Sequence, residues 1–452
     1  MLAEKDLPCA LLLVVYVAIA CVIPAQSDTF YHLRAGQQMW DSHSLITADL
    51  FSWTHYGRPL ANHWWLSQLA FFALYSVGGN VMLTVVAGLC AFAALVISWR
   101  LTKDHGRGRL IALVALLLTL PEWSVRPQVF SLLFMALSLR LLASDRLRLL
   151  CALLVLWANM HAVVILGILI AGVPLLDAIL WERSRILRAA AIATVAAAAP
   201  LLTPFSLHYW PSLLATVQAS RALGLQEYRS AFLLEPTVLA FWAIAAMLIG
   251  AVVSQRHRFG HMERSTRVLV LAALILVPAA ITSTRNIPFL VLAAVPALSR
   301  VIDAQGAGAP QSRPVRPLGW CLLAVAVVCG SIIVAVNWGG GGQRLGWMPL
   351  SHEAVAAIET CPSPIYNSFD DGGYLMWFAR EHRVFVDGRV EAYPLDFLRR
   401  ARTADEGDYK QLFADYRIRC AVVRTQPLYD ALRHDPAMHL AFAGNGWAVF
   451  AP

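Results

Sequence analysis

Long apolar runs recur along most of this chain, from residue 8 to about residue 337. Several reach the ~20 residues that a helix needs to cross the hydrocarbon core of a bilayer. Only 14% of the 452 residues are charged, whereas about 25% is usual in a soluble domain. The pattern predicts a mainly α-helical, polytopic membrane protein that carries a small soluble domain at its C-terminal end.

The first apolar run, residues 7–25, is long enough to span, and no small-x-small cleavage site follows it. We therefore interpret it as an uncleaved first transmembrane helix. Several middle runs fall short of ~20 residues, which fits tilted, re-entrant or buried helices. About eleven spans are expected: 8–25, 70–98, 109–121, 128–142, 147–158, 162–180, 188–204, 237–254, 267–283, 286–300 and 318–337.

The basic residues predict the orientation of these spans. Lys5 and five short clusters hold 18 of the 36 Lys and Arg residues. The positive-inside tendency places them in the cytoplasm, on the inner face of the plasma (inner) membrane. An odd number of spans then leaves the N-terminus inside and the C-terminal domain outside. Such short flanking loops do not suggest nucleic-acid binding. The clusters are 100–109, 140–148, 182–188, 255–267 and 300–316.

Polar and ionisable residues collect in the loops that this topology places outside. The first outer loop, residues 26–66, is rich in Trp, His and Asp, and the second covers residues 205–236. Short outer turns at 122–128, 157–161 and 282–286 add Glu, Arg, Asn and His. A reaction site is therefore expected at this face, because ionisable groups close to hydrocarbon are costly and tend to be functional.

The start of the first outer loop, “SDTFYHLRAGQQMW” (27–40), predicts a helix that lies along the membrane interface. Asp28 and His32 stand one turn apart and are expected to point toward a central cavity. The simple alternative is that Ser27 or Asp28 caps the helix. The expected inner face holds Asp28, His32, Ala35 and Met39, and the opposite face holds Phe30, Leu33, Gln37 and Trp40.

These motifs resemble those of the bacterial GT-C-type integral membrane glycosyltransferases, whose relatives include the protein O-mannosyltransferases and the lipid A aminoarabinose transferases. The resemblance is carried by “SDTFYHLRAGQ”, “DLFSWTHYGRPLANHWWLSQ”, “RPQVFSLLFMAL”, “WANMHAVVILG” and “TRNIPFLVLAAVP”. It covers most of residues 1–300. The stretch 366–393 resembles the extra domain of an uncharacterised bacterial branch of this family.

The resemblance implies that a sugar moves from a polyprenyl-phosphate carrier to a glycan, lipid or protein acceptor of the cell envelope. The family's first-loop acid matches Asp28, which would act as the general base. Many relatives have two adjacent acids there, whereas Thr29 follows Asp28 here. Asp49 is a candidate for the second carboxylate. His32 or His63 would orient the base or the acceptor.

The leaving phosphate gains negative charge, which the forked donors of arginine can stabilise. Arg285 is the first candidate for this role, while snorkelling to lipid headgroups is the alternative for each arginine. His161 is as well explained as a core histidine, and Glu227 as the partner of an arginine. The full set of substrate-binding candidates is Trp64, Arg126, Asn159, His161, Glu227, Arg229, Arg285 and Asn286.

The C-terminal part, residues 351–452, is predicted to be a small α/β domain. A Gly-rich linker, residues 339–350, joins it to a membrane domain, residues 1–338, which includes both outer loops. Alternating helix and strand signals predict a short, mostly parallel sheet with a strand over 383–389 and a final hairpin. Asp371, at a helix start, and Asp387 and Arg389, at a strand end, are ligand-site candidates, with a capped helix and an ordinary turn as the alternative.

The sequence lacks Walker A, GxGxxG and metal-ligand patterns, so no cofactor is indicated, although a divalent metal stays open as an aid to transfer. Cys361 and Cys420 could form a disulfide in an oxidising compartment. The expected partners are the lipid-linked donor, membrane lipid and the envelope acceptor. A transporter or flippase, or a non-catalytic assembly protein on a GT-C scaffold, remains the alternative to an enzyme.

Overall fold

The computed structural model describes residues 6–102, 107–232, 235–303, 317–424 and 427–452. The chain forms two compact units. The helical unit comprises residues 1–24, 83–206 and 226–339, and the C-terminal unit comprises residues 25–82, 207–225 and 340–452. Lys5, residues 103–106 of the first basic cluster and residues 304–316 of the last one lie outside the described residues.

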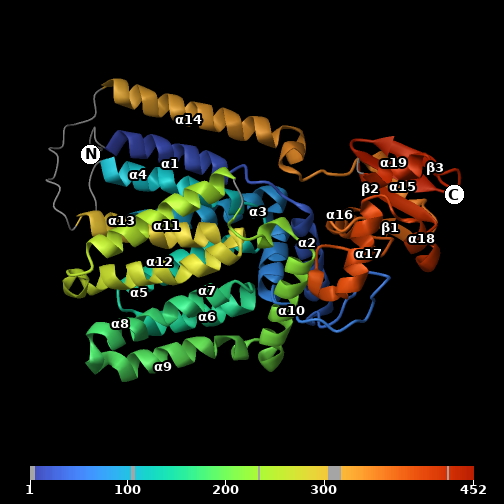
Figure 1. The fold of residues 1–452 in the computed structure, drawn as a ribbon. Coiled ribbons are helices and arrows are strands. Elements are labelled where there is room, and N and C mark those ends of the chain that lie inside the picture. Colours follow the sequence, from blue (N-terminus) through green and yellow to red (C-terminus); the bar gives the residue numbers. More distant parts are fainter. Residues whose placement is uncertain (1–5, 103–106, 233–234, 304–316, 425–426) are drawn as a thin grey trace. The chain divides into compact units, whose positions relative to one another are not determined.

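Every predicted span coincides with helical structure, seen in Figure 1. Six segments within the described residues are long and apolar enough to cross a membrane, so the number of eleven crossings stays a prediction. They are Trp65–Arg100, Val164–Trp181, Pro236–Ser254, Arg264–Thr282, Thr284–Ile302 and Pro317–Leu345. The helices of this unit are α1 (Leu7–Ala20), the second half of α3 (Trp65–Arg100), α4 (Arg107–Ala115), α5 (Gln128–Ala143), α6 (Leu147–Met160), α7 (Val164–Ala171), α8 (Val173–Trp181), α9 (Ile186–Ala197), α11 (Pro236–Ser254), α12 (Arg264–Thr282), α13 (Ile287–Asp303) and α14 (Pro317–Trp338).

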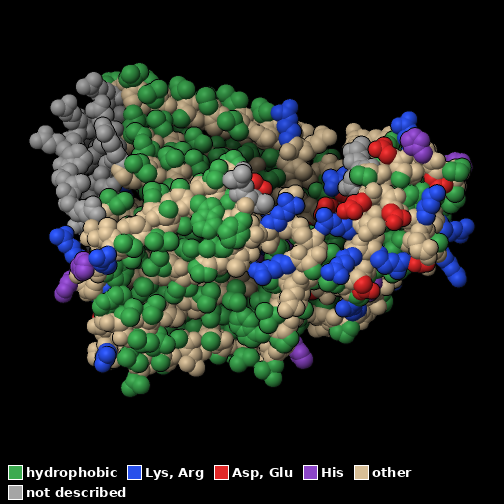
Figure 2. Space-filling view, in the orientation of Figure 1, with side chains coloured by type: hydrophobic (Ala, Val, Ile, Leu, Met, Phe, Trp, Pro, Cys, Tyr) green, Lys and Arg blue, Asp and Glu red, His purple; other side chains and the backbone are tan. Residues whose placement is uncertain are grey.

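Side-chain types separate between the two parts of the chain. In Figure 2 hydrophobic side chains cover most of the visible face of the helical unit, whereas Lys, Arg, Asp and Glu gather over the C-terminal sequence. On α14 most of the large apolar side chains, such as Leu318, Trp320 and Val325, are exposed. An apolar exterior of this kind is stable in lipid and not in water, which agrees with a membrane protein.

The C-terminal unit is built from three separate stretches of sequence. The first outer loop and residues 207–225 of the second group with the last hundred residues, whereas the sequence-based boundaries joined both loops to the membrane domain. Its elements are α2 (Ser27–Ser42), the first half of α3, α10 (Tyr209–Ala222), α15 (His352–Glu359), β1 (Ile365–Asn367), α16 (Gly372–Phe378), the 3-10 helix η10 (Val390–Ala392), α17 (Leu395–Asp405), α18 (Lys410–Tyr416), β2 (Cys420–Arg424), α19 (Pro427–Arg433), β3 (His439–Gly444) and β4 (Trp447–Ala451).

The sheet has the order β1-β2-β4-β3, and only β1 and β2 are parallel. The prediction of a mostly parallel sheet is therefore wrong. The final hairpin turns at Asn445 and Gly446, both with positive φ, and adds two antiparallel strands. The segment predicted as a strand at 383–389 forms a single bridge, between Val384 and Ser52 of the first outer loop.

A side chain takes the place of the missing strand pairing. Asn367 accepts a hydrogen bond from the backbone N–H of Phe385 (2.8 Å) and donates to the carbonyl of Val386 (2.7 Å). The first outer loop binds the other side of this segment, where Trp53 donates its backbone N–H to Val384 (3.0 Å). The segment is thereby held extended without belonging to the sheet.

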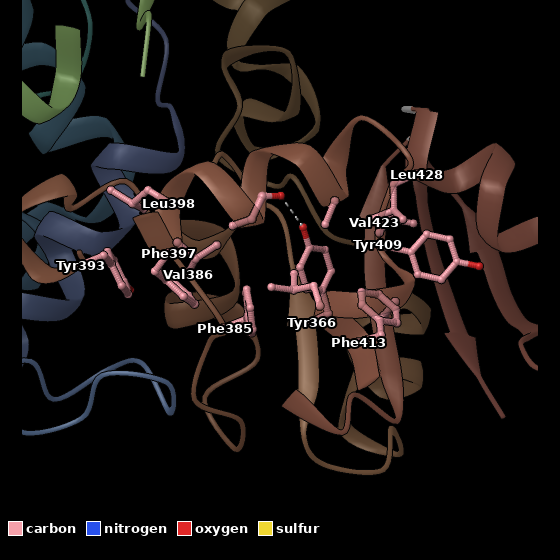
Figure 3. Packing of buried hydrophobic residues seen from close by; sticks show 14 of the residues in the cluster. Tyr366, Phe385, Val386, Tyr393, Phe397, Leu398, Tyr409, Phe413, Val423 and Leu428 are labelled. Carbon is pink, nitrogen blue, oxygen red and sulfur yellow. Dashed lines mark hydrogen bonds between the residues drawn. The ribbon is translucent and has the colours of Figure 1, made fainter. Parts of the chain in front are cut away.

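An aromatic core holds the C-terminal sequence and both outer loops together. Tyr366, Phe385, Phe397 and Phe413 pack around one another in Figure 3, with ring centroids 4.9–5.2 Å apart between neighbours. Leu223 of the second outer loop belongs to this core. Burial of such rings is the main source of stability in a domain of this size.

A disulfide and a run of glycines are two further features of the later part of the chain. Cys361 and Cys420 form a disulfide across a Cα–Cα distance of 5.9 Å, one of the outcomes that the sequence left open. The stretch expected to be a flexible linker folds into 3-10 turns over Gly339–Leu345. Gly340, Gly341 and Gly342 adopt positive φ there, which explains why the run consists of glycine.

Candidate functional site

Asp28 stands in the first turn of α2, where the sequence predicted a helix. The cap of this helix is Gln26, whose backbone N–H donates to Thr29 Oγ1 (2.9 Å) in a capping box. The prediction that Ser27 or Asp28 caps the helix is therefore wrong, since both lie inside the first turn. Asp28 is half-buried, and the helix dipole favours its negative charge at this place.

The face of α2 expected to line a cavity is packed instead. Ala35 and Met39 are buried in a core cluster with Leu375 and Val384. This difference arises because residues 340–452 supply an apolar surface that a sequence-based reading of the loop alone does not contain. Leu33, expected on the membrane side, is fully buried, and Trp40 is half exposed.

His32 belongs to a buried polar chain on the same helix. Gln68 donates from Nε2 to Nδ1 of His32 (3.2 Å) and accepts at Oε1 from Asn62 Nδ2 (2.6 Å). The ring of Trp64 lies 5.9 Å from the imidazole. These hydrogen bonds fix the orientation of His32. Because Nδ1 accepts from Gln68, Nε2 carries the ring proton.

His63 is buried at a separate place in the C-terminal unit. Its Nε2 lies 3.2 Å from Ser212 Oγ, and its ring packs edge-on against Tyr209 of α10, with centroids 4.5 Å apart. Burial lowers the pKa of His63 to about 4, so the imidazole is neutral at physiological pH. These contacts tie the two outer loops together.

Asp49 belongs to a buried charge network whose central residue is Arg389 of the C-terminal sequence. Arg389 donates from Nη2 to Asp49 Oδ1 (2.7 Å) and to Asp387 Oδ2 (2.6 Å), and from Nε to Asp387 Oδ1 (2.7 Å). Tyr393 donates its hydroxyl to Asp387 Oδ2 (2.7 Å). Asp49 also accepts from the backbone N–H of Phe51 (3.1 Å). These saturated contacts favour a structural role for all three charged residues.

Asp371 is fully buried at the start of α16 and faces Arg424, whose Nε lies 2.6 Å from Oδ1. Burial raises the pKa of Asp371 from 3.8 to about 7, although Arg424 acts in the opposite direction. Arg424 stacks near the rings of Tyr374 and Trp447. The predicted location at a helix start is confirmed, and the pair occupies the carboxyl end of the parallel strands β1 and β2.

In the helical unit, two arginines converge on one carboxylate. Arg126 Nη1 donates to Glu227 Oε1 (2.8 Å), and Arg285 Nη1 lies 2.9 Å from Glu227 Oε2. Together the two cations lower the pKa of Glu227 to about 2. Arg285 also contacts Gln128 Oε1 and the hydroxyl of Tyr228 (3.2 Å). The predicted outer turns at 122–128 and 282–286 are thus brought to the second outer loop.

Sequence reasoning missed one member of this arrangement. Glu122 is buried and accepts a hydrogen bond from Gln128, which in turn accepts from Arg285. Burial raises the pKa of Glu122 to about 7. Its position at the end of an apolar run, next to a Pro, was the available signal, because an acid there must find a partner.

The remaining candidates in the helical unit have structural contacts. His161 Nδ1 lies 2.9 Å from Ser131 Oγ, Asn159 donates to the carbonyl of Leu202 (3.3 Å), and Asn286 donates to the carbonyl of Ala279 (2.9 Å). Arg229 is exposed. No group of three or more His, Cys, Asp or Glu side chains within the described residues could hold a metal ion.

The basic loops meet one another at the opposite ends of the same helices. Asp145, after α5, pairs with Arg264 at the start of α12 (2.8 Å) and with Arg185 before α9 (3.3 Å). Gln128 begins α5 and Arg285 follows the end of α12. The two polar clusters are therefore separated by the length of α5, about 24 Å for 16 residues.

The comparisons with known proteins bear on the fold. No protein-family model matches the chain, and no curated protein matches it. The apo oligosaccharyltransferase of Archaeoglobus fulgidus has a TM-score of 0.53 at 13% identity, over 92% of this chain and 69% of that one. The chain shares its fold with an oligosaccharyltransferase. The resemblance to GT-C glycosyltransferases predicted from the motifs is thus confirmed at the level of the fold.

Two further solved structures were found. The A. fulgidus oligosaccharyltransferase AglB, in complex with an inhibitory peptide and a dolichol-phosphate, has a TM-score of 0.49 at 12% identity, over 92% of this chain and 69% of that one. The mycobacterial arabinofuranosyltransferase AftD has a TM-score of 0.45 at 13% identity, over 100% of this chain and 40% of that one. A shared fold does not establish a reaction, so the reaction of this chain has to be argued from its own residues.

Proposed function

We propose that this protein is a glycosyltransferase that moves a sugar from a polyprenyl phosphate to an acceptor of the cell envelope at the outer face of the plasma membrane. The observation that carries the proposal is the convergence of Arg126 and Arg285 on the single carboxylate of Glu227. Two guanidinium groups held 2.8 and 2.9 Å from one anionic group form a site that suits a phosphate.

The carrier phosphate would compete with Glu227 for these donors. The phosphodiester of the donor carries one negative charge, as a carboxylate does, and accepts bidentate hydrogen bonds from arginine, so it can compete with Glu227 for these donors, and the released polyprenyl phosphate gains a second charge. The developing charge on the leaving phosphate is then stabilised where the two arginines already stand. Gln128 and Tyr228 hold Arg285 in place, so little reorganisation is needed.

Asp28 is proposed as the general base that takes the proton of the acceptor hydroxyl. It is a half-buried carboxylate on a helix whose cap is supplied by other residues, so the cap does not account for it. His32 and Gln68 stiffen the same helix. Asp49, proposed earlier as a second carboxylate, is better assigned to the ion pair with Arg389.

The proposed orientation places the loops around Asp145 and Arg264 in the cytoplasm and residues 340–452 outside. The disulfide Cys361–Cys420 supports it, because such bonds persist outside the cytoplasm. The test uses a variant whose free cysteines have been replaced. Single cysteines are introduced into it at position 260 or 383 and labelled in intact cells. Only position 383 should react with an impermeant reagent, and labelling at position 260 would reverse the orientation.

The reaction is tested with the purified full-length protein in lipid nanodiscs. Polyprenyl phosphates that carry a labelled hexose or pentose are the probes, and release of the sugar to water or to an added envelope extract is measured. At least one donor should be consumed with formation of free polyprenyl phosphate. Binding without consumption of any donor, together with passage of the lipid across the bilayer, would favour a flippase.

A further inference from the structure

One glycine of the C-terminal sequence lies directly against the proposed base. A Cβ atom added to Gly388 would lie 2.9 Å from Oδ1 of Asp28 and 3.4 Å from the ring of Tyr31. Real Cβ atoms essentially never approach another heavy atom within 3.0 Å. The carboxylate oxygen of Asp28, which is the end of a side chain, would therefore have to move to admit a Cβ at position 388.

Backbone conformation does not explain this glycine. The φ of Gly388 lies outside the left-handed region, so an L-residue could adopt the same backbone without strain. The requirement for glycine is therefore one of space, and the atom that sets it is the side-chain oxygen of Asp28.

The turn that carries Gly388 is held firmly on both sides. Asp387 precedes it and Arg389 follows it, and the backbone N–H of Arg389 donates to Asp387 Oδ1 (3.0 Å). Both side chains are buried and joined to Asp49 and Tyr393. A turn fixed by so many charged contacts cannot retreat easily from a neighbour.

A second close approach holds the same end of α2. A Cβ added to Gly373 of α16 would lie 2.1 Å from the carbonyl oxygen of Ser27, so the backbones of α16 and α2 are nearly in contact. Phe30 of α2 packs against Phe378 of α16, with ring centroids 5.0 Å apart. The first turn of α2, which carries Asp28, is therefore seated on residues 372–389.

We propose that Gly388 is a positioning residue for Asp28, so that the turn 387–389 forms one wall of the base site and the C-terminal sequence takes part in catalysis. This inference rests on the proposed function of Asp28 as the base. A general base must stand within hydrogen-bond reach of the proton that it abstracts, and a displacement of a few tenths of an ångström up to 1 Å costs turnover.

The first test compares turnover. Gly388→Ala should lower kcat by at least ~10-fold and leave KM for the lipid-linked donor within about 2-fold, because only the base is displaced. In the Asp28→Asn background the same substitution should have no further effect. Gly339→Ala is the control, since a Cβ there meets nothing within 4 Å. Normal turnover of Gly388→Ala, or an equal loss in both backgrounds, would overturn the proposal.

The second test measures the contact without any activity. If the Gly388→Ala variant unfolds at a lower temperature than the wild type, the Asp28→Ala substitution should restore its melting temperature, because it removes the oxygen that the new Cβ meets. Equal destabilisation in both backgrounds would contradict the assigned contact. A wild-type protein that transfers no sugar rejects the proposed function, whereas a wild type that transfers normally beside an equally active Gly388→Ala variant rejects only the positioning role.

Discussion

Arg389 donates a hydrogen bond to Asp49 across 340 positions of sequence, with a distance of 2.7 Å between Nη2 and Oδ1. Both side chains are buried, and Asp387 completes the network. The first outer loop is thereby joined to the C-terminal sequence through a charge pair that water does not screen. The sequence analysis assigned Asp49 to the catalytic site and Arg389 to a ligand site of the C-terminal domain. In the structure both belong to one charge network of the C-terminal unit.

Removal of Arg389 should destabilise the C-terminal unit strongly. Arg389→Gln leaves Asp49 and Asp387 buried without a cation, which costs about 3–5 kcal/mol. Asp49→Asn should cost less, because Asp387 still pairs with Arg389. Urea unfolding of the detergent-solubilised protein, followed by pulse proteolysis, measures both. Arg399→Gln is the control, because it removes an exposed arginine. A change of less than 1 kcal/mol in the free energy of unfolding for Arg389→Gln would contradict the structural role.

Asp28→Asn should reduce sugar transfer by at least ~10²-fold and leave donor binding largely intact, because asparagine has the same size but no basicity. Asp41→Asn, an exposed acid on the same helix, is the matched control and should be nearly neutral. Near-normal transfer by well-expressed Asp28→Asn protein would rule out the base assignment.

Arg285→Gln should weaken binding of free polyprenyl phosphate by roughly 10–100-fold, the cost of one charge-assisted bidentate contact. Arg285→Lys should restore part of it, since the charge returns but the fork does not. Binding of the labelled lipid in nanodiscs is the measurement. Arg229→Gln, which changes an exposed arginine of the second outer loop, should have little effect. Equal losses at positions 229 and 285 would indicate a general membrane-surface effect.

Glu227→Gln tests the competition directly. The pKa of Glu227 is lowered to about 2, so the carboxylate is charged and occupies both arginines throughout the physiological range. Removing its charge should tighten binding of polyprenyl phosphate by a few-fold, because the anion no longer has to displace a carboxylate. Weaker binding would instead mean that Glu227 holds the arginines in their productive positions.

Asp371 should make the stability of the C-terminal unit pH-dependent. Burial raises its pKa to about 7, so the fold favours the protonated form. Its contribution is fully present below pH 4 and is lost as the pH rises through 7. The free energy of unfolding should therefore fall between about pH 4 and pH 7, and Asp371→Asn should reduce this fall by on the order of 4 kcal/mol. An unchanged pH profile of the Asp371→Asn protein would contradict this assignment.

Cleavage of the Cys361–Cys420 bond should destabilise the same unit. The bond closes a loop of 59 residues, for which chain entropy gives about 4 kcal/mol, and 2–5 kcal/mol is the usual range. Cys361→Ser with Cys420→Ser should lower the melting temperature, whereas substitution of the exposed Cys321 and Cys329 should not. A melting temperature equal to that of the wild type would show that the bond is not formed in the native protein.

The sequence by itself determined most of the elements of this protein, because their signals are local. Apolar runs predicted the α-helices of the helical unit, and alternating helix and strand signals predicted the last hairpin. Asp371, Arg285 and Asp28 could be singled out because an ionisable group at a helix end or a membrane edge is conspicuous in a chain with few charges.

Only the tertiary structure decided which of these residues meet. No local pattern couples Asp49 to Arg389, Asp28 to Gly388, or Arg126 to Glu227, since each pair is separated by about a hundred residues or more. The mixed sheet and the grouping of the first outer loop and residues 207–225 with residues 340–452 depend likewise on long-range packing. A buried charge must find a partner wherever the folded chain supplies one, so the partner depends on packing and not on neighbouring sequence.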